Sequence, residues 1–323
     1  MSIAVVRICV VRVIMPELVT VIVNFNTRDL LKACLTDVKR HLAAVDAEIV
    51  VVDNASSDGS AQIVRECFPD VSLIANRENV GFARANNQAI RATDSRCILL
   101  LNTDAFLSAG TLERLQHVLA ADQRAAVAGP RMYDGDGALL ATAHAFESSI
   151  RLAAAALGFH RLLPTSLVLP ASRLLGNTGR LHRLNYDAAG PVEVDWVSGA
   201  CMLVRRSATA EVGLMDERFF MYMEDEDWCR RFVNAGHRVI YVPSASVTHH
   251  VGKSASSTSA SARAYRNSRL VYHQKYDPHL YPLLWLMSNF AAFRQRGSLG
   301  MPGLFTLWSR LRPASAELRE AEP

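Results

Sequence analysis

Four consecutive carboxylates, Glu224 to Asp227, are the residues of this chain whose types and spacing most strongly suggest chemistry. They follow an aromatic and methionine-rich run, Phe219 to Met223, and precede a helical pattern that begins at Trp228. Adjacent negative charges repel, so a fold that keeps them together needs a compensating cation or uses one of them to move a proton. The alternative explanation is an acidic first turn of a helix, which the helix dipole favours.

Polar residues also follow three predicted buried strands, at the points where those strands end. They are Asn24 with Asn26, Asp53 with Asn54, and Asn102 with Asp104. The carboxyl ends of parallel strands meet at one edge of a sheet, and ligands bind there. A single polar residue after a strand is usually a turn former, but three such ends together predict a binding site.

The elements that must position these residues alternate along the chain. Short buried strands alternating with helices of about ten residues predict an α/β fold, with a mostly parallel sheet covered by helices on both faces. We predict strands at 19–25, 48–53, 71–75, 97–101, 125–129, 192–205 with a break at 198–200, and 238–242. We predict helices at 29–41, 81–93, 111–121 and 262–276, one opening at Ser57 or Asp58, and a loop at 254–261.

The composition is that of a globular protein with a sizeable core: of 323 residues, half are hydrophobic and a fifth charged. A net charge of +4 without a basic run argues against a nucleic-acid partner. The six cysteines are widely spaced without a Cys-x-x-Cys motif, which indicates buried thiols in the reducing cytoplasm. The apolar run 1–15 contains two arginines and makes a poor signal peptide. No stretch reaches the roughly 20 apolar residues that span a bilayer.

Several motifs together resemble the family 2 glycosyltransferases. The segment 51–60 reads VVDNASSDGS, 79–87 reads NVGFARANN, and 99–104 reads LLLNTD, similar to the family's DxD metal motif. Later blocks match at 198–200, 219–230 and 247–249, so the resemblance covers about 17–275 and is nearest to bacterial rhamnosyltransferases of cell-surface polysaccharide assembly. Asn102 replaces the first acidic residue of the DxD motif and leaves Asp104 as its only carboxylate.

The resemblance implies a GT-A, Rossmann-like fold and a reaction. An inverting enzyme would move a sugar from a nucleotide-diphosphate donor, dTDP-rhamnose as first choice or another dTDP- or UDP-sugar, to a hydroxyl of a glycan or lipid-linked glycan acceptor. It implies Asp225 as catalytic base with Glu224 beside it, and Asp104 and His249 as ligands of a divalent cation, Mg or Mn. It implies a nucleotide site built from Asn24, Asn26, Asp53, Asn54, Asn79, Arg84 and Asn102.

We divide the chain into an N-terminal extension (1–16), a GT-A catalytic domain (17–261) and a C-terminal helical region (262–323). Within the catalytic domain we expect a nucleotide-sugar half at 17–130, an insertion at 143–190 and an acceptor half at 191–261. The C-terminal region mixes apolar and basic residues from Tyr281 to Arg312, which suits peripheral contact with the inner face of the plasma membrane. Packing on the catalytic domain or in a dimer interface explains that composition equally well.

Two other functions fit parts of the pattern. A nucleotidyltransferase that forms nucleotide sugars needs a Gly-rich, basic loop after the first strand, whereas Asn24 to Arg28 contains no glycine. A catalytically inactive nucleotide- or sugar-binding module would keep the polar strand ends. It would have no need of Asp225, Asp104 and His249 together.

Overall fold

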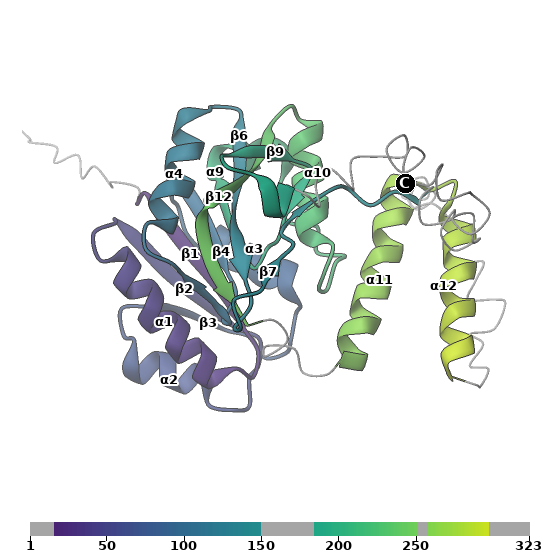
Figure 1. The fold of residues 1–323 in the computed structure, drawn as a ribbon. Helices are drawn as coiled ribbons and strands as arrows, with labels where there is room; N and C mark the ends of the chain where they lie inside the picture. The colour runs from purple at the N-terminus through teal and green to yellow at the C-terminus, as the bar shows by residue number, and fades with distance from the viewer. Residues whose placement is uncertain (1–15, 150–183, 251–257, 297–323) are drawn as a thin grey trace, which may run out of the picture.

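A ten-stranded sheet with helices on both faces forms the body of the protein in the computed structural model, which describes residues 16–149, 184–250 and 258–296 (Figure 1). A separate two-stranded sheet lies beside it. The strands are β1 (Leu18–Asn24), β2 (Ala47–Asp53), β3 (Ser72–Ala75), β4 (Cys97–Leu101), β5 (Ala105–Leu107), β6 (Ala125–Tyr133), β7 (Leu139–Leu140), β8 (Ala143–His144), β9 (Val192–Val194), β10 (Trp196–Val197), β11 (Cys201–Arg205) and β12 (Arg238–His249).

The main sheet has the strand order β3-β2-β1-β4-β11-β6-β12-β5, with β7 paired to β6 and β9 to β12. Strands β1 to β4 are mutually parallel, and β6 and β12 run in the same direction because β11 is antiparallel to both β4 and β6. The sheet is therefore mostly parallel, as predicted. The carboxyl ends of β1, β2 and β4 lie at one edge and bring the predicted polar residues together.

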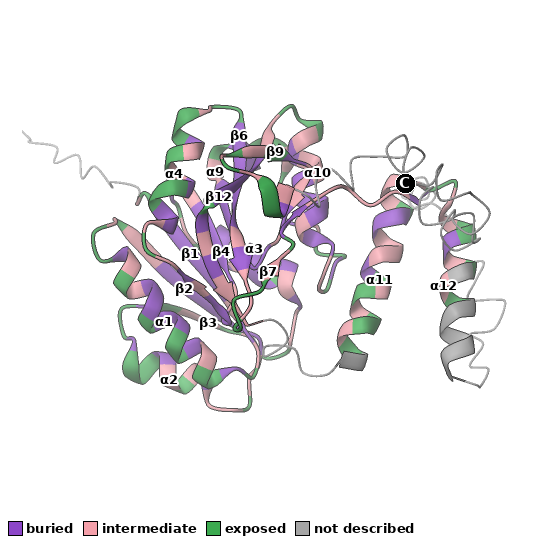
Figure 2. Cartoon of the chain, viewed as in Figure 1, coloured by how far each residue is buried: buried purple, intermediate pink, exposed green. Residues whose placement is uncertain are grey.

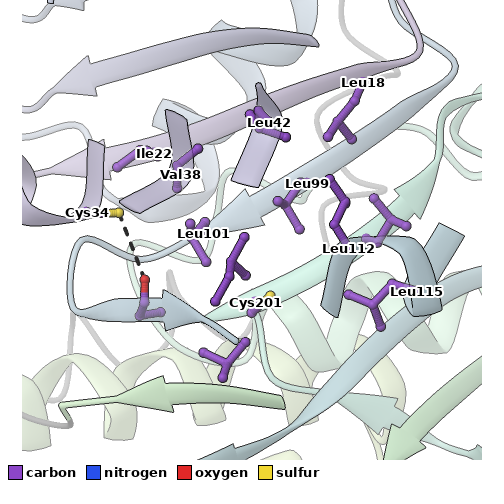
Figure 3. Packing of buried hydrophobic residues seen from close by; sticks show 14 of the residues in the cluster. Leu18, Ile22, Cys34, Val38, Leu42, Leu99, Leu101, Leu112, Leu115 and Cys201 are labelled. Carbon is purple, nitrogen blue, oxygen red and sulfur yellow. Dashed lines mark hydrogen bonds between the residues drawn. The ribbon is translucent and has the colours of Figure 1, made fainter. Parts of the chain in front are cut away.

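Helices cover both faces of the sheet because its central strands are hydrophobic on both sides. One core lies beneath α1 (Arg28–Leu42), α2 (Ser60–Cys67) and α4 (Thr111–Ala121). The other lies beneath α3 (Phe82–Ala92), α9 (Arg206–Val212) and α10 (Glu224–Asn234). Figure 2 shows the strands buried between these layers, and Figure 3 shows the packing of the first core around Leu99 and Leu101.

The cysteines follow the prediction in part. Cys34, Cys201 and Cys229 are buried free thiols, and burial raises the pKa of each. Cys67 lies exposed on the last turn of α2, so the expectation of a buried thiol is wrong there.

Two helices follow the sheet: α11 (Thr258–Tyr276) and α12 (Tyr281–Arg296). Helix α11 packs alongside α10, and α12 lies against α11 on the side away from the sheet (Figure 1). Helix α11 begins four residues before its predicted start, so the loop predicted over 254–261 is wrong for 258–261. The proposed N-terminal extension and most of the predicted insertion lie outside the described residues. None of the described helices is long and apolar enough to cross a membrane.

Candidate active site

A cavity of about 590 Å³ opens at the carboxyl ends of the strands. Asn54, Asn79 and Asn102 line it from the first half of the chain. Glu224 and Asp225 line it from the start of α10, and His249 lines it from the end of β12. The fold therefore brings most of the predicted site residues to one hollow.

Asn24 and Asp53 lie at the ends of β1 and β2 and bond to each other, but they do not line the cavity. The Asn24 amide donates to Asp53 Oδ1 at 2.8 Å and to Ser56 Oγ at 3.0 Å, and Thr27 Oγ1 donates to Asn24 Oδ1 at 2.6 Å. The other oxygen of Asp53 accepts the backbone N–H of Ser56 at 3.0 Å. Both side chains are buried and order the loops after β1 and β2.

Two further predicted nucleotide residues, Asn26 and Arg84, do not line the cavity either. Asn26 adopts a left-handed backbone conformation (φ 53°), and its side-chain oxygen accepts the backbone N–H of Ser57. Arg84 is half-exposed on α3 and lies 3.7 Å from the carboxylate of Glu217. Asn26 and Arg84 each contact another protein group in the structure. A direct contact of either residue with a nucleotide stays a prediction.

Asp104 and His249 meet where β5 pairs with the end of β12. His249 Nε2 lies 3.2 Å from Asp104 Oδ1, and the Asp104 carbonyl accepts the backbone N–H of His250 at 2.9 Å. His250 itself packs edge-on against Phe106. Neighbouring ligands of an octahedral cation, each about 2.1 Å from it, lie about 3 Å apart. The Asp104–His249 pair therefore fits a small divalent cation.

This pair provides two protein ligands. Within the parts of the chain that the structure describes, no cluster of three or more His, Cys, Asp or Glu side chains could hold a metal ion. A cation at Asp104 and His249 would need further oxygen ligands from a bound diphosphate and from water. Such a site fits an ion that binds together with a nucleotide.

Asp225 is held in place by backbone donors. Its Oδ2 accepts the N–H of Gly199 at 2.9 Å, and its Oδ1 accepts the N–H of Glu226 at 2.9 Å. A side chain at position 199 would crowd it, because an added Cβ there would lie 3.3 Å from Asp225 Cβ. The small-residue break predicted at 198–200 thus positions the carboxylate. Burial raises the pKa of Asp225, partly offset by these N–H groups.

Glu224 has different surroundings. Its side chain lines the cavity although the residue is only 5% exposed, and its Oε2 has no hydrogen-bond partner among the described residues. Burial, reinforced by the negative charge of Asp225, raises the pKa of Glu224 well above its usual range. An unsatisfied buried carboxyl oxygen is costly, so this oxygen is free to bond a water or a ligand hydroxyl in the cavity.

The other two carboxylates of the cluster have structural partners. Glu226 accepts the N–H of Glu147, and burial raises its pKa to about 7. Asp227 is fully buried and accepts bonds from Arg231 at 2.9 Å, Lys275 at 2.6 Å and the Tyr276 hydroxyl at 2.8 Å. All four carboxylates lie in the first turn of α10, as the alternative explanation expects, but only Glu224 and Asp225 line the cavity.

Sequence reasoning missed two features of the site. Gly81 lies against the 219–223 segment: Phe82 N–H donates to Phe220 O at 2.6 Å, and a Cβ on Gly81 would lie 2.4 Å from that oxygen. Helix α11 contributes cavity wall through Ala260, Ser261 and Ala264. The Gly81-Phe82-Ala83 sequence (the GFA motif) is a signal for the Gly81 contact. The alanine and serine side chains of α11 carry no chemical signature that would predict the wall.

The mixed sheet, the cavity at its carboxyl edge and the residues around it define a GT-A-like α/β protein. A sequence profile of glycosyl transferase family 2 matches residues 20–213, more than half of the chain. The chain therefore belongs to glycosyl transferase family 2, as the motifs implied. It is a glycosyltransferase with rhamnosyltransferase and hexosyltransferase relatives.

Among these relatives is the N-acetylglucosaminyl-diphospho-decaprenol L-rhamnosyltransferase of Mycobacterium tuberculosis, 31% identical over 268 residues, with 76% of this chain and 81% of the relative covered. Another is the low-salt glycan biosynthesis hexosyltransferase Agl10 of Haloferax volcanii, 25% identical over 67% of this chain and 61% of the relative. A crystal structure of GalNAc-T7 with UDP, GalNAc and Mn²⁺ has a similar fold. Its TM-score is 0.53 at 17% identity, with 80% of this chain and 47% of that one covered.

Proposed function

We propose that this protein is an inverting glycosyltransferase that moves a sugar from a nucleotide-diphosphate donor to a hydroxyl of a lipid-linked or surface glycan. One observation carries the proposal: Glu224 and Asp225 line the same cavity as Asn54, Asn102 and His249, and His249 lies 3.2 Å from the buried carboxylate of Asp104. A base for the acceptor and binding groups for a diphosphate are thus arranged around one space. A nucleotidyltransferase has no need of the base.

Each residue has a role in this reaction. Asp225, oriented by the N–H groups of Gly199 and Glu226, takes the proton of the acceptor hydroxyl as its oxygen attacks the anomeric carbon. Glu224 accepts a hydrogen bond from the acceptor. Asp104 and His249 would hold Mg²⁺ or Mn²⁺, which neutralises the charge of the leaving diphosphate.

The first-choice donor is dTDP-rhamnose, with UDP-sugars as the alternative, and the acceptor is an N-acetylglucosaminyl diphosphate on a prenyl chain. The Mycobacterium tuberculosis relative, an N-acetylglucosaminyl-diphospho-decaprenol L-rhamnosyltransferase, supports a rhamnosyl donor and a prenyl-linked acceptor. A prenyl-linked acceptor requires the enzyme to work at a membrane surface. Leu283 and Leu286, 40% and 60% exposed on α12, support peripheral contact there. Sedimentation of the wild type and a Leu283→Ser/Leu286→Ser variant with anionic vesicles tests this contact.

Acceptor-dependent release of nucleoside diphosphate tests the function. We expect wild type to release dTDP from dTDP-rhamnose when N-acetylglucosaminyl-diphospho-decaprenol is present. Asp225→Asn should lose at least about 100-fold in rate, since general bases contribute roughly 10²–10⁴-fold. Asp29→Asn, a control on an exposed carboxylate of α1, should match wild type.

Two results would contradict the proposal. Nucleotide binding without release of dTDP from any donor and acceptor pair indicates an inactive binding module. Pyrophosphate production from a nucleoside triphosphate and a sugar phosphate indicates a nucleotidyltransferase.

A further inference from the structure

Helix α11 closes the cavity on the side of the catalytic carboxylates. The family profile ends at residue 213, so this helix lies outside the matched segment. Ala260, Ser261 and Ala264 on its N-terminal half line the cavity together with Phe220 and Tyr222. The wall that these small side chains form is the part of the site with no counterpart in the matched motifs.

The contacts of α11 fix this wall in place. Ala264, Ser268 and Tyr272 recur every four residues and so share one face of the helix. Ser268 Oγ donates to the carbonyl of Met221 at 2.8 Å, and the ring of Tyr272 is buried among residues of the 219–223 segment. The Tyr272 hydroxyl also accepts a bond from Arg230 at 3.0 Å. The face that presents Ala264 to the cavity is therefore tied to the segment that ends at Glu224.

The wall next to α11 is aromatic. Phe220 lines the cavity although 48% of its surface is exposed, and Tyr222 beside it packs edge-on against Tyr265 at 5.9 Å. Asp225 and Glu224, whose Oε2 is unpartnered among the described residues, line the same cavity as these rings. Apolar ring surface next to carboxylate oxygens matches a pyranose, which has an apolar face and hydroxyl groups around its edge.

We propose that the part of the cavity lined by Ala260, Ser261 and Ala264 of α11 and by Phe220 and Tyr222 is the subsite for the acceptor sugar. The ring lies against the aromatic side chains, and its hydroxyl groups reach Asp225 and Glu224. Ala264 determines which acceptors fit, because a larger side chain there occupies the space of the sugar. This inference rests on the proposed glycosyl transfer and adds the residues that select its acceptor.

The test is an Ala264→Phe variant with Ala262→Phe as the matched control, since Ala262 lies exposed on the same helix and does not line the cavity. With dTDP-rhamnose and N-acetylglucosaminyl-diphospho-decaprenol, we expect Ala264→Phe to raise the acceptor KM at least 10-fold. Its thermal stabilisation by dTDP and Mn²⁺ and its acceptor-independent hydrolysis of the donor should match wild type. Ala262→Phe should match wild type in all three measurements.

A second variant keeps the test decisive if Ala264→Phe does not fold. Phe220→Ala removes an aromatic side chain that lines the cavity at an exposed position. It should also raise the acceptor KM without changing dTDP binding. A wild-type acceptor KM in both variants would overturn the subsite. Loss of dTDP binding in either variant would overturn it too, because the helix or the loop would then shape the whole site. If wild type binds dTDP but transfers no sugar, the result contradicts the proposed glycosyl transfer, and with it the acceptor subsite.

Discussion

Glu224 and Asp225 are neighbours in the chain, but their surroundings give them different chemistry. Asp225 receives one backbone N–H on each oxygen, which fixes its direction. Glu224 is buried at the cavity wall with one oxygen unpartnered among the described residues. Burial raises the pKa of both carboxyl groups, so each holds its proton to a higher pH than an exposed carboxyl does. A base with a raised pKa is better suited to accept a proton from a hydroxyl.

Glu226 should make the stability of the protein depend on pH. Its pKa rises from 4.5 to about 7 on folding. Between these values the folded state binds more protons than the unfolded state, so the free energy of unfolding falls as pH rises. Glu226→Gln removes this loss and still offers an oxygen to the Glu147 N–H. Relative to wild type, the variant should therefore gain about 3 kcal/mol between pH 4.5 and pH 7.5, at about 1.4 kcal/mol per pKa unit.

Urea unfolding of both proteins across this pH range measures the gain. Glu113→Gln, at an exposed position of α4, serves as the control and should show no pH-dependent difference from wild type. A constant difference between Glu226→Gln and wild type at every pH would show that Glu226 titrates alike in the folded and unfolded states.

At the scale of elements, the start of α3 is joined to the segment before α10. Tyr222 and Met223 both have positive φ angles, 71° and 69°, which turn the chain into α10. The hydrogen bond from Phe82 N–H to Phe220 O connects this turn to the GFA motif. The close contact at Gly81 thus couples the nucleotide half of the chain to the catalytic carboxylates.

Gly81→Ala and Gly137→Ala form a matched pair that tests this contact. Both glycines have positive φ, 86° and 83°, so both variants should lose roughly 1–2 kcal/mol of stability from backbone strain. Gly137 has no atoms near an added Cβ, whereas Gly81 faces Phe220. Gly81→Ala should therefore lose a further ~1–3 kcal/mol and also reduce the transfer rate. Equal losses in urea unfolding would show that the Phe220 contact does not constrain the turn.

The elements that the sequence predicted well are those with a strong local signal. Strand β4 and helix α4 have the predicted bounds, because apolar runs and helical spacing are local properties. Strand β5 and helix α9 escaped prediction because they are short and form through pairing and packing. Strand β12 continues to His249 by pairing with β6 and β5, well past its predicted end.

The site was predictable where residues follow a strand and carry a polar group. Asn54 and Asn102 fulfil that expectation by lining the cavity, and His249, which only the resemblance implied, lines it as well. The contact between Arg84 and Glu217 could not be predicted from sequence, because Glu217 lies more than a hundred residues away in the chain. The wall contributed by α11 depends on a helix packing at a distance, which no local pattern reveals.

At the scale of the whole molecule, the groups for the diphosphate come from distant parts of the chain. Asp104 lies in the turn between β4 and β5, and His249 ends β12. Asn54 follows β2, on the other side of β1 from β4. A ligand that bridges these groups joins both halves of the sheet. Its binding should stabilise the entire fold against unfolding.

A thermal-shift panel of UDP, dTDP, GDP and CDP, each with and without Mn²⁺, tests this linkage. A ligand at 100 times its dissociation constant stabilises the folded state by about 2.7 kcal/mol, which raises the melting temperature measurably. We expect one pyrimidine diphosphate to give the shift only with metal, because the two protein ligands need the phosphates to complete the site. Asp104→Ala should abolish the shift, and Asp136→Ala, at an exposed turn position, should preserve it. A metal-independent shift that survives in Asp104→Ala would move nucleotide binding away from the Asp104–His249 pair.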